Sequence, residues 1–199
     1  MRTLSLTFCA LALVAALPLR AQEPRTPTPG SVIEGTAGDH ALQMRYLTAA
    51  PFQSIPSDLD YGLLVSNQHN VIGSAAWLIH TDLDLVPHLS FDIGPQAYVA
   101  SLAEQSRGIL ATSVGGDARL DLIPRLGIAA YGSAFYAPSV LVFGAANNVY
   151  DFTAGVQVRF APRLLALAGY RWFRYSLQNS PDDTVQNSVF VGMRWNLGQ

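Results

Sequence analysis

Apolar and polar residues alternate along several stretches of the chain, most clearly between Val149 and Ala161. The even positions of this stretch are apolar: Tyr150, Phe152, Ala154, Val156, Val158 and Phe160. The odd positions include Asp151, Thr153, Gln157 and Arg159. Because successive side chains of a β-strand point to opposite faces, the pattern predicts a strand with one apolar and one polar face. Aromatic residues at both ends of the apolar face are typical of membrane-crossing strands.

Nine further stretches complete a predicted set of ten strands. Residues 88–99, 107–122 and 188–197 alternate clearly, with Phe190 as the one apolar exception on the polar face of the last. Weaker patterns predict strands at 32–38, 40–49, 58–67, 71–85, 126–137 and 164–176. An arginine facing lipid costs roughly 2–4 kcal/mol, so Arg171 is expected to point inward and Tyr170 and Trp172 outward. Eight strands are the alternative, because 32–38 is short and 50–57 is an irregular turn.

Prolines divide the chain into nearly equal hairpin-sized periods. Pro51, Pro87, Pro124 and Pro162 follow one another at intervals of 36, 37 and 38 residues. Each period fits one pair of strands closed by a tight turn. Longer connections are expected at 101–106, 138–148 and 177–186, alternating with the short turns. Short turns on one side, long loops on the other and an even strand number predict an antiparallel up-and-down transmembrane β-barrel.

The N-terminal segment predicts export. Residues 1–21 combine a positive start, an apolar run and a small residue at Ala21, as in a cleaved signal peptide. Residues 22–30 are read as an extended Pro/Thr-rich leader, and residues 31–199 as the barrel domain. The single cysteine, Cys9, lies in the segment expected to be removed. The mature chain therefore has neither a disulfide framework nor a thiol nucleophile.

Composition favours a membrane protein over a soluble one. Charged residues make up 13% of the chain and apolar residues 50%, whereas about 25% charged is usual in soluble domains. Removal of the signal peptide takes away Arg2 and Arg20, which leaves ten of the twelve Lys and Arg residues against fourteen carboxylates. The mature chain is therefore not basic, and nucleic acid is not an expected partner. Alternation alone does not say which face points outward, so a secreted soluble barrel with an apolar ligand inside remains an alternative. Charge scarcity and paired aromatic ends favour lipid outside, with water and ionic groups in the lumen.

One cluster of polar residues is expected at an end of the lumen. If the turn at Pro87 pairs Asp84 with His88, antiparallel register places the next inward pairs close by. The candidate cluster is His80, Asp82, Asp84, His88, Ser90 and Asp92. Imidazole and carboxylate groups bind divalent cations or relay protons, but a solvated ionic lining is the favoured interpretation. No metal site is therefore assigned.

His88, Ser90 and Asp92 are also the ingredients of an acyl-transfer triad. Residues two apart on one strand lie nearly 7 Å from each other, roughly twice the 3.3 Å rise, which is too far for direct hydrogen bonds between short side chains. We therefore expect no enzymatic activity and assign no catalytic residue. No phosphate loop, dinucleotide motif or paired zinc-ligand motif is present, so no cofactor is expected.

Charges of both signs are expected to fill the lumen. The candidates are Asp117, Arg119, Asp121, Asp151, Arg159, Arg171 and Arg194. In a small barrel such groups commonly pair, and Asp151 and Arg171 are predicted to form a diagonal pair across adjacent strands. Tyr131 and Phe135 are expected to face inward and narrow the lumen. A selective path for water or ions is the alternative to a paired structural lining.

The C-terminal third resembles a known family. The residues that carry the resemblance are Phe135-Tyr136-Ala137-Pro138, Ala154-Gly155-Val156, Pro162 with Leu164, and Ala168-Gly169-Tyr170-Arg171-Trp172. From Phe135 onward the chain resembles the YfaZ family of predicted outer-membrane barrels. The resemblance implies an outer-membrane location but brings no established activity, substrate or catalytic residue.

The resulting expectation is a monomeric, cofactor-free barrel in the outer membrane of a Gram-negative bacterium. Its expected partners are outer-membrane lipid and the outer-membrane assembly machinery. A structural or surface-interaction role is the first interpretation. A narrow pore for small solutes or ions is the second, and a lipid-modifying barrel enzyme or a secreted ligand-binding barrel follows.

Overall fold

The computed structural model describes residues 30–51, 55–82, 88–102, 107–144, 146–177 and 183–198. The expected signal peptide and all of the expected leader except Gly30 lie outside the described residues. Two 3₁₀ turns, Pro124–Leu126 and Ser139–Leu141, accompany the strands. In the part of the chain that the structure describes, no helix is long and apolar enough to cross a membrane.

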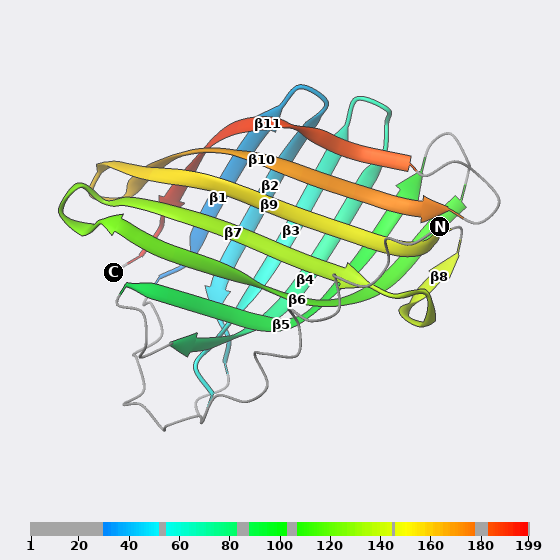
Figure 1. Cartoon of the computed structure of the whole chain (residues 1–199), viewed down its shortest axis with the longest axis horizontal. Coiled ribbons are helices and arrows are strands. Elements are labelled where there is room, and N and C mark those ends of the chain that lie inside the picture. Colours follow the sequence, from blue (N-terminus) through cyan, green and yellow to red (C-terminus); the bar gives the residue numbers. More distant parts are fainter. Residues whose placement is uncertain are drawn as a thin grey trace, which may run out of the picture.

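Ten antiparallel strands close into a barrel (Figure 1). They are β1 (Val32–Gly38), β2 (Ala41–Ala49), β3 (Ser57–Ser66), β4 (Val71–Asp82), β5 (Leu89–Leu102), β6 (Arg107–Ile123), β7 (Ile128–Ala137), β9 (Ala146–Ala161), β10 (Leu164–Leu177) and β11 (Asp183–Asn196). Each strand pairs with its neighbours in chain order, and β1 pairs with β11 to close the wall. The short β8 (Val142–Gly144) lies beside β6. Closure confirms the predicted fold and the count of ten wall strands.

The strands extend farther than the alternation predicts at one end of the barrel. The end of the barrel at which β1 starts and β11 ends is called the termini end. The opposite end, where the strands extend farther than predicted, is called the loop end. β5 runs to Leu102, two residues into the predicted connection 101–106, whereas β6 begins at Arg107 as predicted. The connection 138–148 contains the unpredicted β8, and β9 already begins at Ala146. Backbone pairing stays favourable beyond the apolar band, so hydrophobic alternation does not mark where a ladder ends.

The apolar faces point away from the lumen, as the alternation predicts. Every wall strand carries an exposed apolar residue; one from each is Ile33, Leu42, Leu63, Val71, Val99, Val114, Tyr136, Val156, Tyr170 and Val191. An apolar surface that encircles the molecule is typical of contact with a membrane. This orientation is opposite to the one that a soluble barrel with an apolar ligand inside requires.

Three inward aromatic rings lie opposite glycines of neighbouring strands. The pairs are Phe135 with Gly115, Tyr131 with Gly155 and Phe190 with Gly169. A Cβ atom on these glycines would lie 2.7, 2.9 and 2.8 Å from the respective ring. Only glycine leaves room for a ring that lies against the adjacent strand. This explains why Phe190 interrupts the polar face of β11, and the predicted inward placement of Tyr131 and Phe135 is confirmed.

Apolar side chains fill the loop half of the lumen. The buried cluster includes Leu64, Ile72, Tyr98, Ile109, Phe173 and Tyr175, each no more than 3% exposed. The Phe173 ring lies 5.7 Å from that of Tyr98 and 5.1 Å from that of Tyr175, centroid to centroid. The expectation of water and ionic groups throughout the lumen is therefore wrong for this half. Bulky side chains can fill the interior of a narrow barrel by close packing, as in the core of a soluble protein.

Candidate functional site

A buried ion pair lies where the apolar half of the lumen meets the polar half. Arg171 of β10 donates two hydrogen bonds to the Asp151 carboxylate of β9, at 3.0 and 2.7 Å. The Tyr98 hydroxyl donates to the same carboxylate at 3.1 Å. Arg171 also donates to the Gln43 side chain of β2. The predicted pairing of Asp151 with Arg171 is confirmed, and its hydrogen bonds to Tyr98 and Gln43 connect it to strands that are not its neighbours in the wall.

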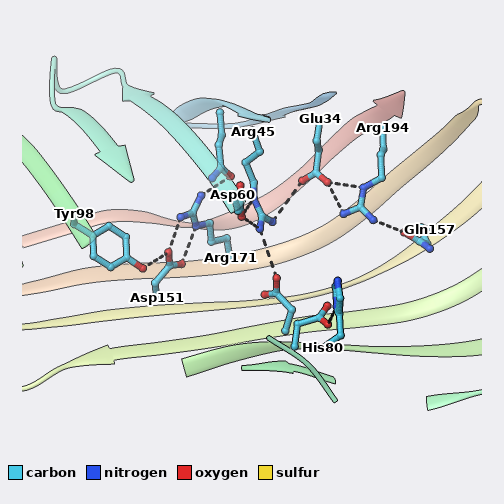
Figure 2. Close-up of polar contacts among 12 residues, drawn as sticks. Glu34, Arg45, Asp60, His80, Tyr98, Asp151, Gln157, Arg171 and Arg194 are labelled. Carbon is cyan, nitrogen blue, oxygen red and sulfur yellow. Dashed lines mark hydrogen bonds and ion pairs between the residues drawn. The ribbon is translucent and has the colours of Figure 1, made fainter. Parts of the chain in front are cut away.

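A second network centres on Arg45 of β2 (Figure 2). Its Nε–H donates to the Asp60 carboxylate at 3.0 Å, and its guanidinium lies 3.6 Å from Asp117 and 3.9 Å from Glu34. Arg194 of β11 donates to Glu34 at 2.8 and 2.6 Å, and to the Gln157 side chain at 3.2 Å. Two arginines thus bind three carboxylates contributed by strands β1, β3 and β6.

We call these residues together the charged layer: Glu34, Arg45, Asp60, Asp117, Asp151, Arg171 and Arg194. Asp117, Asp151, Arg171 and Arg194 are predicted from the sequence as lumen charges, whereas Glu34, Arg45 and Asp60 are not. The alternation of side chains does contain the signal for these residues. Arg45, for example, stands between the outward-facing Met44 and Tyr46 and therefore faces inward, although its strand is weakly patterned. Applying the parity test to 32–38, 40–49 and 58–67 finds all three.

His80 of β4 contacts two carboxylates near the termini end. Its Nδ1 is hydrogen-bonded to Asp92 of β5, and its Nε2 lies 3.3 Å from Asp58 of β3. The register confirms the predicted pairs of His80 with Asp92 and of Asp82 with Ser90. Asp58, which the sequence analysis does not name, is the second partner. The three side chains are 21–30% exposed, so water reaches this group.

Of the other members of the predicted cluster, the structure describes His88, Ser90 and the backbone of Asp82. His88 is exposed in the turn before β5, with φ of 69°. Asp84 and the side chain of Asp82 lie outside the described residues. Within the described part of the chain, no group of three or more His, Cys, Asp or Glu side chains is arranged to hold a metal ion. Asp92, one of the three residues considered above as an acyl-transfer triad, is hydrogen-bonded to His80.

Two other predicted lumen charges lie in more open positions. Arg119 donates two hydrogen bonds to Asp121, two residues further along β6, at 3.0 and 2.8 Å. Both side chains are 36% exposed. Arg159, near the termini end of β9, is exposed rather than buried in the lumen. Strand parity predicts the face of a residue but not its depth in the barrel, so the exposure of Arg159 did not follow from the sequence.

A small polar cavity adjoins the charged layer. It measures about 120 Å³ and is lined by Arg45, Gln96, Asp117, Tyr131 and Arg194, among others. One oxygen each of Gln96, Asp117 and Tyr131 has no hydrogen-bond partner among the described protein atoms. Such a volume holds a few water molecules, which would hydrogen-bond these oxygens, whereas ligand pockets commonly measure about 300–1,000 Å³.

Fold and site together define a class: a closed antiparallel β-barrel of the outer-membrane type, with an apolar exterior and a filled lumen. The family comparison is specific. The family model described as YfaZ precursor matches residues 62–197, and the chain belongs to this family. The resemblance stated from the C-terminal motifs is confirmed and extends through most of the barrel. No curated protein matches the chain.

Two solved structures are similar to the chain at low sequence identity. One, "Bacterial polysaccharide outer membrane secretin", is 11% identical with a TM-score of 0.48, and the match covers 82% of this chain and 57% of that one. The chain thus spans less than two thirds of that protein. The other is a KdgM porin in complex with disordered oligogalacturonate, 11% identical with a TM-score of 0.42, covering 83% of this chain and 98% of that one.

Proposed function

We propose that this protein is a non-conducting outer-membrane barrel with a structural or surface-interaction role. The observation that carries the proposal is the apolar packing of the loop half of the lumen. Side chains from nine wall strands meet there, and the largest of them are almost fully buried. Ions cross a membrane only along a polar or hydrated path, and packed aromatic rings at one end of the lumen provide none.

An outer-membrane position is supported by the exterior and by the family. A closed barrel pairs all its wall strands, which satisfies backbone groups that lipid does not hydrogen-bond. With an even strand number, the two chain ends share one side of the membrane, which we assign to the periplasm. Export through the predicted signal peptide is consistent with this orientation.

Absence of enzymatic activity remains part of the proposal. The buried carboxylates Glu34 and Asp151 of the charged layer are held in ion pairs with arginines, which leaves them poorly placed to act as acids or bases. The His80 group opens toward the termini end, away from the exterior where lipid substrates lie. We further propose that the barrel is monomeric, because a closed wall leaves no strand edge to pair with another chain. Its partners are then outer-membrane lipid and the assembly machinery.

Single-channel recording in a planar bilayer tests the closed lumen. The purified full-length barrel is expected to give no steady conductance. A variant carrying Phe173→Ala and Tyr175→Ala is expected to show openings, because it removes two rings from the apolar packing. The matched control Phe152→Ala removes a ring from the outer face and should remain silent. Steady conductance of the unmodified protein would refute a closed lumen and favour the narrow pore.

Fractionation tests the location independently. The protein is expected in the outer-membrane fraction and to migrate differently on a gel before and after boiling, because folded membrane barrels resist detergent. Recovery from soluble periplasmic extract, with no change of mobility on boiling, would contradict the proposal. The conductance experiment and the fractionation thus test separate parts of the same function.

A further inference from the structure

An apolar groove interrupts the otherwise convex outer wall across strands β3 to β6. It measures about 250 Å³ and is lined by Leu59, Tyr61, Ala75, Ala76, Trp77, Pro95, Ala97 and Thr112. None of these residues is charged. The groove belongs to the lipid-facing surface and lies on the outside of the wall, apart from the charged layer and the lumen cavity.

Small side chains create the hollow. Cross-strand register places Tyr61, Ala75, Ala97 and Thr112 in one row across β3, β4, β5 and β6. Two alanines therefore lie between a tyrosine and a threonine, and neighbouring outward positions carry larger residues such as Leu63 and Val99. Trp77, opposite Leu59 in the next row, closes one side. The result is a shallow slot with Trp77 on one side, while on the other side Gly73 lies between Leu63 and Val99.

The floor of the slot coincides with a break in the β4–β5 ladder. Pairing continues on both sides, from Ala76 with Gln96 to Ile79 with Ile93, but the two positions between are not paired. Pro95 lies in this gap and has no N–H to donate. A Cβ atom on Gly94 would lie 1.8 Å from the Trp77 carbonyl oxygen, so the backbones approach there without regular pairing.

The break explains an unusual feature of the groove. Ala76 belongs to the inward face of β4 and is 6% exposed, yet it lines the outer groove. Behind it, Ala76 packs with the lumen residues Leu78 and Phe135 in a small apolar cluster. The wall is therefore thin at this point, and apolar side chains extend from the outer surface to the lumen.

We propose that this groove binds one acyl chain of a membrane phospholipid. The inference rests on the proposed membrane location but not on the closed lumen. A groove on a lipid-facing wall is surrounded by hydrocarbon, and its lining offers no ionic group to a polar ligand. A stable protein interface takes about 20–30 residues a side, whereas eight residues line the groove. A single flexible chain fits the shape.

Native mass spectrometry of the detergent-purified, delipidated barrel tests the proposal with added dipalmitoyl phosphatidylethanolamine. The unmodified barrel is expected to retain one lipid. Ala97→Leu fills the slot and should lower the lipid-bound fraction about tenfold, because the chain loses buried methylene contacts. Ala154→Leu is the matched control, since it adds the same side chain at an exposed outward alanine of β9 and should leave retention unchanged.

Fluorescence gives a second measurement on the same variants. The protein has three tryptophans, Trp77, Trp172 and Trp195, so Trp172→Phe with Trp195→Phe leaves only the one in the groove. Phosphatidylethanolamine brominated on its acyl chain, added at one lipid per barrel in detergent, should quench Trp77. Adding Ala97→Leu should abolish the quenching. A barrel that retains only Trp172, on the outer face of β10, should be quenched little.

Three outcomes would overturn the proposal: equal lipid retention by Ala97→Leu and Ala154→Leu, equal quenching of Trp77 and Trp172, or a dimer of the unmodified barrel that Ala97→Leu dissociates. Heat-dependent gel mobility identifies a variant that has not folded, in which case Ala75→Leu replaces Ala97→Leu in the same assays. Ion conductance by the unmodified barrel would refute the closed lumen while leaving lipid retention unaffected, so the two failures are distinguishable.

Discussion

The two halves of the lumen are filled in different ways although one set of strands builds both. In the loop half, Tyr98, Phe173 and Tyr175 pack with aliphatic residues from neighbouring strands. Toward the termini end, the charged layer and its cavity occupy the interior. The outer face shows no such change, because apolar side chains are exposed on every wall strand. Lipid imposes one requirement on the whole exterior, whereas a narrow lumen can be closed in either manner.

The comparison teaches what each kind of filling demands. Apolar packing requires only that volumes match, and loss of a side chain leaves a cavity. Buried charges require a partner for each group, and loss of one member leaves the other desolvated and unpaired. The charged layer therefore constrains which strands lie opposite one another. Its contacts reach from β2 to β10 and from β2 to β6.

The largest expected effect comes from emptying the loop half. Phe173→Ala with Tyr175→Ala should reduce the free energy of unfolding by more than about 5 kcal/mol, since a single buried Phe→Ala change costs about 3–5 kcal/mol. Urea unfolding from lipid vesicles, followed by tryptophan fluorescence, measures this. Phe152→Ala on the lipid face is the control and should cost clearly less. Equal losses would show that the lumen rings are not tightly packed.

Breaking the ion pair at the boundary of the halves should have the next largest effect. Arg171→Met leaves the Asp151 carboxylate buried with only the Tyr98 hydroxyl as a partner, at an expected loss of about 3–5 kcal/mol. Adding Asp151→Leu to the same chain should recover much of that loss, because the unpaired charge is removed. The same urea titration compares the single and double variants. A double variant no more stable than the single one would contradict the unpaired-charge explanation.

Overpacking an aromatic–glycine pair should have a moderate effect. In Gly169→Ala the new methyl group meets the Phe190 ring and the Ala154 carbonyl oxygen, so we expect a loss of about 1–3 kcal/mol. Combining it with Phe190→Leu relieves the contact with the ring but not the one with the backbone. Partial recovery by the second change would therefore support the pairing. Gly73→Ala, where the nearest atom would be 3.9 Å away, is the control and should be nearly neutral.

The smallest effect is expected at the open termini end. Arg119→Ala removes an ion pair whose two side chains are 36% exposed, so water replaces the partner and the loss should stay below about 1 kcal/mol. The urea midpoint should shift only slightly, in contrast with Arg171→Met. A loss as large as that of Arg171→Met would show that the Arg119–Asp121 pair is as closed to water as the buried Arg171–Asp151 pair.

Much of the wall and part of the lumen follow from local sequence. Alternation between Val149 and Ala161 predicts a strand, its lipid face and the inward position of Asp151. The free-energy cost of exposing an arginine to lipid correctly predicts that Arg171 points inward, even though Leu165 and Leu167 lie on the same face of the strand. The register expected for the two strands joined by the turn before Leu89 correctly predicts that His80 lies beside Asp92. These predictions succeed because strand parity and hairpin pairing depend on residues close together in the chain.

What the sequence by itself determined is therefore which residues form strands and which way each side chain points. The tertiary structure decided depth and long-range partners. Parity places both Arg159 and Arg171 inward, but only the folded barrel shows one exposed at a rim and the other buried. Glu34 meets Arg194 across 160 positions because closure brings the first strand beside the last. Parity repeats every two residues and carries no information about height along the lumen or about the strand across it.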